Sequence, residues 1–521
     1  MSKKAVFCAH TQSIAYVTNI LACLRGCHLG KIVYPTINNL RSSSNLSCCL
    51  LRAQQNNCHE HFKWNRKFGL KGHYFACRDL PQTPVLYIGR SSSEILLRPT
   101  LITMKLESPE FRSIFTPELQ LLIDLFRKYD YELRIAGGAV RDLLVGKIPS
   151  DIDFATTATP DQMKEMFTTE NIRMLNANGE AHGTVTVRIN DKTNFEVTTL
   201  RIDVVTDGRR AQVEFTKDWI LDSNRRDLTV NSMFLGFDGT VYDYFNGLED
   251  LKEKRIRFVG SPEQRIQEDY LRILRYFRFY GKLADSPHAH DQATLAAIKD
   301  NAGGLARVSG ERIWLELKKI LTGRLTAPLF KQMIDVGLGQ FIGLPRAHNF
   351  EELHKVCDRT AAIPYHHMTR LTALLEDETD VYKCHERNKI SNDELSLALF
   401  IVHHRNDRMG ENLLSYCTKL HLDWSVKETK VLNKIVELMK YCGHMEVAEE
   451  FPKLKLPIFP ITGHDLTQNE VPRGPKFAWT LNELRKIWQE SEYKLTTEEL
   501  VKHIPSLLEN APENVKKMRK K

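Results

Sequence analysis

One short segment places the strongest constraint on how this chain folds. Arg134–Phe154 reads RIAGGAVRDLLVGKIPSDIDF, so apolar runs lead first into a glycine pair and later into two aspartates. The run Leu133–Ala136 predicts a short strand that ends at Gly137 and Gly138. Because glycine has no side chain, the backbone at this point can approach an anion closely. The segment therefore predicts a strand followed by a phosphate-binding turn.

A helix is expected directly after the glycine pair. Ala139–Leu144 has the pattern of a helix start, whose free amides favour phosphate groups. Arg141 lies one turn into this helix, where it can meet a phosphate oxygen. The Walker pattern GxxxxGK[ST] does not occur, since Gly146-Lys147 is followed by Ile148. The expected turn is therefore not a P-loop.

Two aspartates that flank Ile152 predict a metal site. Residues two apart in a strand point to the same face, so Asp151 and Asp153 would project together. Such carboxylates repel each other unless a cation lies between them, and oxygen ligands next to substrate phosphates suit Mg²⁺. Glu196, in the pattern FEVTTL, can add a third oxygen from a neighbouring strand. A lone DxD or a lone glycine pair is a weak signal, but here both fall within one short segment.

The pattern of the chain changes along its length. A helix is expected over Pro109–Tyr129, and strands over Gly183–Ile189, Asn194–Leu200 and Asn231–Phe237. After Ser261 the strand signals fade and helical patterns continue to the end of the chain. No stretch is apolar for the ~18 residues that a transmembrane helix needs, so no membrane partner is expected. The sequence predicts an α+β protein with a mixed-sheet part followed by an all-helical part.

Residues 1–103 differ from the rest in charge and in cysteine content. The first hundred residues carry 13 Lys or Arg and three acids, a net charge of +10, whereas the remainder carries 60 basic and 62 acidic residues, a net charge of −2. Seven of the eleven cysteines also precede position 100, without metal-ligand spacing. Poor acid content with scattered Arg and Ser is typical of an organelle transit peptide. The alternative is a non-structural extension, and Met104 is a candidate second start.

Five motifs together resemble the class II tRNA nucleotidyltransferases, the CCA-adding enzymes, within the DNA polymerase beta type of nucleotidyltransferase. They are GGAVRDLLVG…DIDF (Gly137–Phe154), RIDVVTDGRRAQVEF (Arg201–Phe215), RRDLTVNSM (Arg225–Met233), EDYLRILRYFRF (Glu268–Phe279) and SGERIWLELKKIL (Ser309–Leu321). The resemblance covers residues 104–330 in strict order and the helical remainder more loosely. A late stretch, TGHDL, resembles the tail of such enzymes, although Asn469 and Val471 stand where glycines are usual.

The resemblance implies a fold and an organisation. The fold class is a mixed-sheet nucleotidyltransferase head followed by an elongated all-α neck, body and tail. The expected parts are an extension that is transit-like and disordered (1–103), a catalytic head (104–245), a helical neck with a nucleotide-selecting helix (246–305), a helical body (306–445) and a tRNA-binding tail (446–521). A mitochondrial location is implied, with a second form, cytoplasmic or nuclear, from Met104.

The resemblance also implies an activity and the residues that perform it. The activity is template-independent addition of CCA to a tRNA 3′ end from CTP and ATP with Mg²⁺, by a monomer or a homodimer. Catalysis falls to Asp151, Asp153 and Glu196, the first two as metal ligands. The implied nucleotide-binding residues are Gly137, Gly138, Arg141, Arg226, Asp269, Arg272, Arg275 and Arg278. Asp203, Asp207, Gly208 and Arg209 fall in the family's mobile loop.

Asp269 and Arg272 explain how a protein can choose bases without a template. Three residues apart on a helix, they would share a face. A carboxylate accepts and a guanidinium donates hydrogen bonds, which matches the exocyclic amine and bare ring nitrogen of cytosine and adenine. Uracil and guanine present the reverse pattern, and a buried mismatch of this kind can reject a wrong group by ~10⁴–10⁵. The simpler alternative is a surface ion pair worth under ~1 kcal/mol.

Three other functions remain open at this point. A poly(A) polymerase of the same class shares every head motif and would make a long A tract. A non-catalytic RNA-binding protein would be expected to lose the acidic residues that are intact here. An enzyme that transfers nucleotides to small molecules or proteins fits the long helical half and its basic end, Lys516–Lys521, less well.

Overall fold

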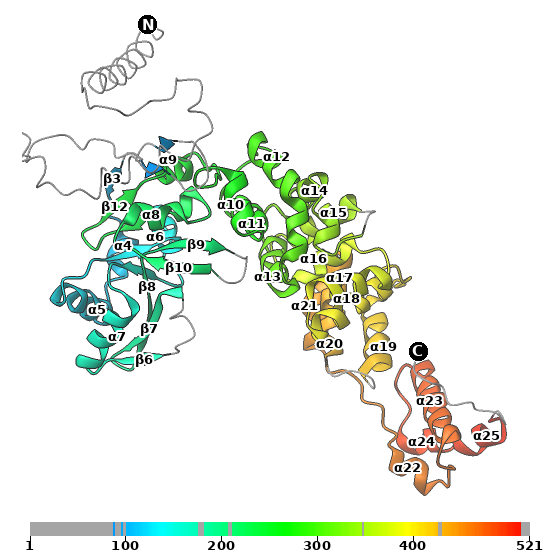
Figure 1. Cartoon of the computed structure of the whole chain (residues 1–521). Helices are drawn as coiled ribbons and strands as arrows, with labels where there is room; N and C mark the ends of the chain where they lie inside the picture. Colours follow the sequence, from blue (N-terminus) through cyan, green and yellow to red (C-terminus); the bar gives the residue numbers. More distant parts are fainter. Residues whose placement is uncertain are drawn as a thin grey trace, which may run out of the picture. The chain divides into compact units, whose positions relative to one another are not determined.

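The computed structural model (Figure 1) describes residues 87–88, 95–96, 101–175, 182–206, 211–345, 349–425 and 430–511. The chain divides into two units, residues 1–97 and 98–521. In the first unit, the described residues form one antiparallel pair, β1 (Tyr87–Ile88) with β2 (Ile95–Leu96). The expected transit segment therefore lies almost entirely outside the described residues.

The second unit begins with a mixed sheet of eight strands, as the sequence predicts. Its spatial order is β3 (Ile102–Lys105), β12 (Thr240–Asp243), β11 (Phe234–Leu235), β4 (Leu133–Ala136), β5 (Asp153–Thr156), β8 (Thr193–Thr199), β7 (Thr184–Ile189) and β6 (Arg173–Leu175). The pair β5 and β8 is parallel and the other neighbours are antiparallel. Met104, the candidate second start, lies inside β3 and pairs with Val241.

One face of the sheet is covered by helices. Part of the other face carries a small apolar cluster that includes Ala136, Ala155, Phe234 and Trp219, and the rest is left for polar residues. Val185, Val187 and Ile189 alternate along β7 and are buried, while the residues between them are half-buried. α5 (Pro117–Lys128) and α7 (Pro160–Thr169) both contact β7. The period-2 pattern of the strand therefore sends every second side chain, including Thr184 and Thr186, to the open face.

The helix expected over Pro109–Tyr129 is two helices, so that expectation was wrong in detail. α4 (Pro109–Ser113) ends before Thr116, whose backbone is extended with φ −87° and ψ 162°, and α5 begins at Pro117. Proline disfavours helical backbone in the residue before it, and the Thr116 hydroxyl caps the new helix by accepting from the Leu119 amide at 3.2 Å. The apolar spacing continues across this break, which is why periodicity alone missed it.

A long hairpin and several short elements complete the part around the sheet. β9 (Arg201–Thr206) pairs with β10 (Ala211–Phe215), and α8 (Trp219–Asn224) follows. The strand expected over Asn231–Phe237 is shorter, because Thr229–Asn231 forms the 3₁₀ helix η3 and only Phe234–Leu235 pairs as β11. The backbone there turns to bring Asn231 under the glycine pair instead of extending.

The rest of the unit is helical, as expected. Its elements are α9 (Gly247–Lys252), α10 (Pro262–Glu268), α11 (Arg272–Leu283), α12 (Gln292–Asn301), η4 (Ala302–Arg307), α13 (Gly310–Leu321), α14 (Thr326–Asp335), η5 (Gly339–Phe341), α15 (Phe350–Arg359), α16 (His367–Leu371), η6 (Thr372–Leu374), α17 (Glu378–Asn388), α18 (Asn392–His404), α19 (Leu413–Ser425), α20 (Val431–Cys442), α21 (Met445–Glu450) and η7 (Phe451–Lys453). One continuous core of buried side chains extends from Phe111 to Phe451. No helix in the described ranges is long and apolar enough to span a membrane.

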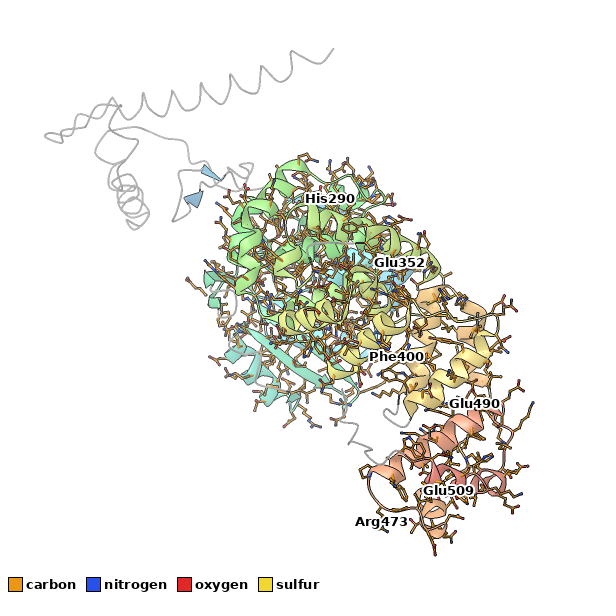
Figure 2. All side chains as sticks on the ribbon, turned by 90° about the vertical axis from the view of Figure 1, so that its right-hand side faces the viewer. His290, Glu352, Phe400, Arg473, Glu490 and Glu509 are labelled. Atoms are coloured by element: carbon orange, nitrogen blue, oxygen red, sulfur yellow. The ribbon has the colours of Figure 1, made fainter. Side chains whose placement is uncertain are left out.

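Aromatic packing fixes the start of this helical part. His290, labelled in Figure 2, is 6% exposed and stacks on Tyr280 of α11 at 3.7 Å between ring centroids. Its Nδ1 lies 2.9 Å from the Tyr276 hydroxyl. α11 is thereby held against the loop that leads into α12.

The last helices form a separate core. α22 (Gly463–Gln468), α23 (Pro475–Glu490), α24 (Thr497–Val501) and α25 (Ile504–Glu509) surround Leu466, Leu484, Trp488, Leu500 and Ile504, and Figure 2 labels Arg473, Glu490 and Glu509 among them. Leu422 of α19 is the member of this core that comes from the preceding helices.

Candidate active site

A cavity of about 1330 Å³ lies between the open face of the sheet and the first long helices that follow it. Every residue that the sequence singled out for catalysis or nucleotide binding lines this cavity: Gly137, Gly138, Arg141, Asp151, Asp153, Glu196, Arg226, Asp269, Arg272, Arg275 and Arg278. These residues come from segments as far apart as β4 and α11. The fold therefore brings a dispersed set of charged side chains to one place.

The turn after β4 needs glycine at its first position. Gly137 has φ +66°, a conformation that side chains disfavour, and a Cβ there would lie 3.0 Å from Nη1 of Arg226. The Gly137 amide donates to the Met233 carbonyl at 3.2 Å, which ties the turn to the segment after η3. α6 (Gly138–Leu144) begins at the next residue, close to the helix start that the sequence predicts.

The carboxylates of the predicted metal site face the cavity, although not from a single strand. β5 begins at Asp153, so Asp151 lies just before the strand and not within it as expected. Across the parallel pair, Asp153 is in register with Glu196 of β8. The surrounding protein partly desolvates Asp153 and raises its pKa; Arg226 opposes this shift and Asp151 adds to it. Asp153 is therefore a carboxylate that gains from a nearby cation.

The residues present fit a divalent cation that is completed by substrate. Within the described ranges, no group of three or more His, Cys, Asp or Glu side chains is placed to hold one ion. Glu196 therefore does not form a three-residue cluster with Asp151 and Asp153, and these two aspartates remain the candidate ligands. Mg²⁺ is commonly held by one or two carboxylates together with water and substrate phosphates, so two carboxylates suffice.

Arg141 is buried beside the glycine turn. Its Nη1 donates to Oδ1 of Asn231, and its Nε and Nη2 donate to Oδ1 of Asp142 at 3.0 and 2.9 Å. Lys282 of α11 also donates to Asp142, at 3.0 and 3.2 Å. One carboxylate therefore joins the helix after the glycine turn to α11.

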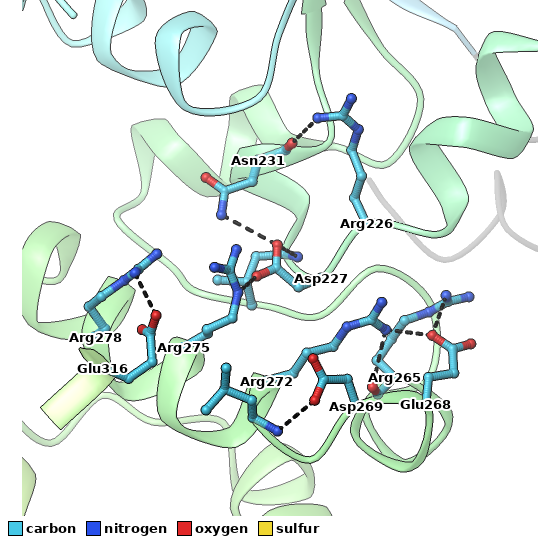
Figure 3. Close-up of polar contacts among 12 residues, drawn as sticks. Arg226, Asp227, Asn231, Arg265, Glu268, Asp269, Arg272, Arg275, Arg278 and Glu316 are labelled. Atoms are coloured by element: carbon cyan, nitrogen blue, oxygen red, sulfur yellow. Dashed lines mark hydrogen bonds and ion pairs between the residues drawn. The ribbon is translucent and has the colours of Figure 1, made fainter. Parts of the chain in front are cut away.

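Arg226 is held over the turn by a buried acid. Its Nε and Nη2 donate to Oδ2 of Asp222 at 3.2 and 3.1 Å. Its Nη1 donates to the Asn231 carbonyl at 3.3 Å (Figure 3). Asp222 is itself only 1% exposed, so the acid that holds the guanidinium is enclosed by the protein. The guanidinium is thus oriented before any ligand arrives.

The helix expected over Glu268–Phe279 is broken, and this corrects the premise on which Asp269 and Arg272 were paired. α10 ends at Glu268, Asp269 is extended with φ −151° and ψ 106°, and α11 begins at Arg272. Oδ1 of Asp269 accepts from the Leu271 amide at 3.1 Å, and Oδ2 accepts from Nη2 of Arg312 at 2.8 Å. The two residues share a cavity wall because of a turn, not because of helical spacing.

Arg272 is oriented by backbone carbonyls and by one acid. Its Nη1 donates to the Arg265 carbonyl at 3.1 Å and to Glu268 (Figure 3). Its Nη2 donates to the Arg225 carbonyl at 2.9 Å. Its side chain is 12% exposed, so the simple surface ion pair considered above does not describe it. Other residues hold the two side chains in place: Arg312 holds Asp269, and the carbonyls hold Arg272.

The next two arginines of α11 each have a buried acidic partner. Nε of Arg275 donates to Oδ2 of Asp227 at 2.6 Å, and Nη1 of Arg278 donates to Oε1 of Glu316 at 2.9 Å (Figure 3). Burial raises the pKa of Asp227, but Arg275, the Leu228 amide and Arg272 together lower it, and the net pKa lies below the usual range. Both arginines stay charged at the cavity wall.

Several contributors were not singled out from the sequence. Asn231, Asp227, Arg225, Lys282 and Arg312 line the cavity and hold the predicted residues in place. Asn231, Asp227 and Arg225 lie inside the motif RRDLTVNSM, and Arg312 lies inside SGERIW, so the motifs carried a signal that was not assigned residue by residue. Asp203 pairs with Arg201 at 3.5 Å, while Asp207, Gly208 and Arg209 lie outside the described residues.

Two family models match parts of this chain, and named relatives match most of it. Residues 133–257 match the model of the poly A polymerase head domain, and residues 291–349 match a probable RNA- and SrmB-binding site of polymerase A. A mouse protein named CCA tRNA nucleotidyltransferase 1, mitochondrial, is 52% identical over 411 residues, which is 78% of this chain and 94% of the mouse protein. A human protein of the same name is 51% identical over 406 residues, 78% of this chain and 93% of its own length.

The chain belongs to the CCA tRNA nucleotidyltransferase family. The fold of the family is also seen in the solved CCA-adding enzyme of Bacillus stearothermophilus in complex with CTP, with TM-score 0.59 and 24% identity over 78% of this chain and 98% of that one. The Thermotoga maritima CCA-adding enzyme complexed with tRNA has TM-score 0.55 and 18% identity over 78% of this chain and 99% of that one. The family name establishes an RNA nucleotidyltransferase, in agreement with the resemblance seen in the sequence.

Proposed function

We propose that this CCA tRNA nucleotidyltransferase adds C, C and A in turn to the 3′ end of tRNA, from CTP and ATP and without a template. The observation that carries the proposal is that two carboxylates, a glycine turn, and the pair Asp269 and Arg272 line one cavity. The names of the mouse and human relatives agree with this reaction and with tRNA as the acceptor.

The carboxylates and basic residues divide the chemistry between them. Asp151 and Asp153 would hold Mg²⁺, which lowers the pKa of the attacking 3′-hydroxyl and stabilises the leaving pyrophosphate. The Gly138 backbone, Arg141 and Arg226 would bind the triphosphate. Because both guanidiniums are oriented by Asn231, Asp142 and Asp222 before binding, little reorganisation is needed in the transition state.

Base selection is assigned to Asp269 and Arg272. Each carboxylate oxygen of Asp269 has one hydrogen bond in the structure and retains a lone pair for the amine of cytosine or adenine. The Nε hydrogen of Arg272 and one Nη2 hydrogen are not used by its three oxygen partners and remain for the ring nitrogen. Uracil or guanine would place acceptor against acceptor and donor against donor.

Replacement of Asp151 or Asp153 tests the metal assignment. Asp153→Ala and Asp151→Ala should each lower nucleotide addition at least ~10³-fold, because positioning and charge neutralisation supply most of the rate. Binding of tRNA, measured by filter retention, should be unchanged within about twofold. Near-normal turnover in either variant would refute the assignment.

Replacement of Asp269 tests the base-selecting role. Asp269→Ala should incorporate UTP and GTP at rates within about 100-fold of CTP, because the edge that rejects them is lost. Pyrophosphate release with each nucleotide alone would be measured for both proteins. A variant that still rejects UTP and GTP as fully as the parent would contradict the edge-matching argument.

A poly(A) polymerase is the alternative function, because the matched head-domain model is named for that activity. The two activities differ in product length. A tRNA that lacks its last three nucleotides, supplied with CTP and ATP, should be extended by CCA and no further. A long A tract on the same acceptor would favour the alternative.

The organisation and location are further parts of the proposal. We assign residues 104–245, 246–305, 306–445 and 446–521 to head, neck, body and tRNA-binding tail, with Mg²⁺ as the metal, in a monomer or homodimer. The mitochondrial relatives support a mitochondrial location with residues 1–103 as a transit-like extension. A second form that starts at Met104 would lack Ile102 and Thr103 of β3.

A further inference from the structure

The turn that carries Asp269 packs against a glycine in a distant 3₁₀ helix. Gly304 lies in η4, and a Cβ built on it would overlap Cγ, Cδ1 and Cε1 of the Tyr270 ring. Tyr270 is the residue directly after Asp269. The ring therefore lies against the bare backbone of Gly304, so close that a Cβ at this position would overlap it.

Tyr270 is also part of the turn from which α11 begins. The Arg272 amide donates to the Asp269 carbonyl at 2.9 Å, and the Ile273 amide donates to the Tyr270 carbonyl at 3.2 Å. Oδ1 of Asp269 receives the Leu271 amide. A displacement of the Tyr270 backbone would thus move Asp269 and the first turn of α11, including Arg272, together.

The surface beneath the ring is fixed by α17. Arg387 donates through Nη2 to the carbonyls of Leu305 at 2.9 Å and Val308 at 3.1 Å, and through Nε to the Phe341 carbonyl at 2.8 Å. The Leu305 carbonyl belongs to η4, and Val308 follows η4 directly. Three backbone oxygens that share one guanidinium cannot move independently, so η4 is a rigid support for the ring.

We propose that the contact between Tyr270 and Gly304 sets the position of Asp269 and Arg272 and is thereby a determinant of base choice. Tyr270 and Gly304 are positioning residues, since neither is placed to touch the base. The proposal rests on the function proposed above and names a specificity element outside the residues assigned to it. A misplacement of about 1 Å in such a site can cost ~10²-fold, so a methyl group at position 304 is enough to be felt.

Gly303 provides a matched control beside Gly304. A Cβ at Gly303 would meet only Cζ of Phe341 at 4.0 Å, an ordinary contact. Gly303→Ala and Gly304→Ala therefore make the same chemical change in the same short helix, one into free space and one into the Tyr270 ring. Differences between the two variants report the ring contact and not the loss of a glycine.

The readout is the ratio of UTP or GTP incorporation to CTP incorporation, on a tRNA transcript that lacks its last three nucleotides. This ratio does not depend on the fraction of enzyme that is folded. Gly304→Ala should raise it by at least ~10-fold and raise the KM for CTP and ATP more than it lowers kcat, because the polymerising carboxylates are untouched. Gly303→Ala should leave the ratio at the parent value.

A second pair of variants isolates the ring. Tyr270→Ala removes the ring and creates no overlap with Gly304, and it should raise the ratio of UTP or GTP incorporation to CTP incorporation (the error ratio). Tyr270→Phe keeps the ring and should restore the parent ratio. In the Tyr270→Ala background, adding Gly304→Ala should have little further effect, since the atoms that it displaces are gone. Full-length protein is used throughout.

Two results would overturn the proposal: an error ratio of Gly304→Ala equal to that of Gly303→Ala, or an undiminished effect of Gly304→Ala in the Tyr270→Ala background. Failure of the proposed function would look different, because the parent protein would then not extend the tRNA by CCA at all.

Discussion

At the scale of single residues, the site is built from charges whose partners are already in place. Arg226, Arg272, Arg275 and Arg278 each have an acidic partner in the structure. Breaking a fully buried pair typically costs ~3–5 kcal/mol, because the remaining charge is left uncompensated. The pairs in which Glu268 is 33% and Arg275 is 32% exposed should cost less, because water screens the remaining charge. The same side chains therefore stabilise the fold and prepare the cavity for an anionic ligand.

One buried residue makes stability depend on pH. Desolvation, with a smaller effect of His288, lowers the pKa of His290 to about 4, while its Nδ1 lies against the Tyr276 hydroxyl. The unfolded chain binds a proton near pH 6.5 and the folded chain does not, so His290 makes the protein less stable as pH falls from about 6.5 towards about 4. The full effect is about 3 kcal/mol.

The His290 prediction is checked by urea unfolding at pH 7.5 and pH 5. The decrease in the free energy of unfolding between these values should be smaller in His290→Asn than in the parent by roughly 1–2 kcal/mol. His288→Asn serves as the comparison, because His288 is exposed in the same loop and its effect on His290 is smaller than that of desolvation, so this variant should change the pH dependence much less than His290→Asn does. If the free energy of unfolding of His290→Asn decreased between pH 7.5 and pH 5 by as much as that of the parent, the low pKa of His290 would be contradicted.

At the scale of elements, the sheet and the long helices could be predicted from sequence, while the breaks could not. Alternation in GTVTVRI and NFEVTTL corresponds to β7 and β8, and the apolar spacing of SGERIWLELKKIL corresponds to α13. The break at Asp269 has no proline or glycine to mark it. It depends on an Asp side chain that bonds two residues ahead and on a contact with Gly304, which is remote in sequence.

The same limit applies to the site residues. The motifs that carry the family resemblance identified residues that line the cavity, because their chemical types are constrained by phosphate and base. It did not identify the residues that orient them, such as Arg312 and Lys282, whose partners Asp269 and Asp142 lie far away in the chain. Pairings of this kind are set by tertiary structure, so local sequence patterns carry little information about them.

The edge strand β3 gives a prediction about where a stable chain can begin. Ile102 and Thr103 pair with Asp243 and Tyr242 of β12, so a chain that starts at Met104 loses half of β3. Two lost cross-strand pairs cost roughly 1 kcal/mol. A chain that starts at Leu101 keeps the whole strand and is the matched comparison.

The two chains would be compared by their midpoints of urea unfolding. We expect the midpoint of the Met104 chain to lie below that of the Leu101 chain, with an unchanged slope, because the loss is local. Equal midpoints would show that the pairs made by Ile102 and Thr103 contribute nothing to stability, and the Met104 form would then be as stable as the longer one.

At the scale of the whole molecule, two cores can be separated by one cut. The last buried residue of the larger core is Phe451, and Leu456 packs against that core. Apart from Leu422, the residues of the smaller core begin at Ile461. Between them Ile458 is 85% exposed, and few side chains hold the connection. A chain that ends at Leu456 should therefore stay folded and lose the unfolding signal of Trp488, which belongs to the smaller core.

If the final helices bind tRNA as proposed, the shortened chain should bind tRNA at least ~10-fold more weakly, because each lost phosphate contact reduces affinity. Its base choice, measured as the error ratio, should match that of the full chain, because the cavity lies in the larger core. Unfolding of the whole shortened chain would contradict the separation, and unchanged tRNA affinity would contradict the role of the tail. The contact between Leu422 and the smaller core makes Leu422→Gln a useful addition to the shortened chain.

The carboxylate of Asp142 has a consequence for how this protein can diversify. It receives Arg141 from the helix that follows the glycine turn and Lys282 from the helix that carries Arg272, Arg275 and Arg278. Selection for another nucleobase would change α11. Because Asp142 joins α11 to the helix that carries Arg141, each such change would also shift the residues proposed to bind the phosphates. Compensating mutations at positions 142 and 282 are therefore expected to arise early and together in any laboratory evolution of new nucleotide preference.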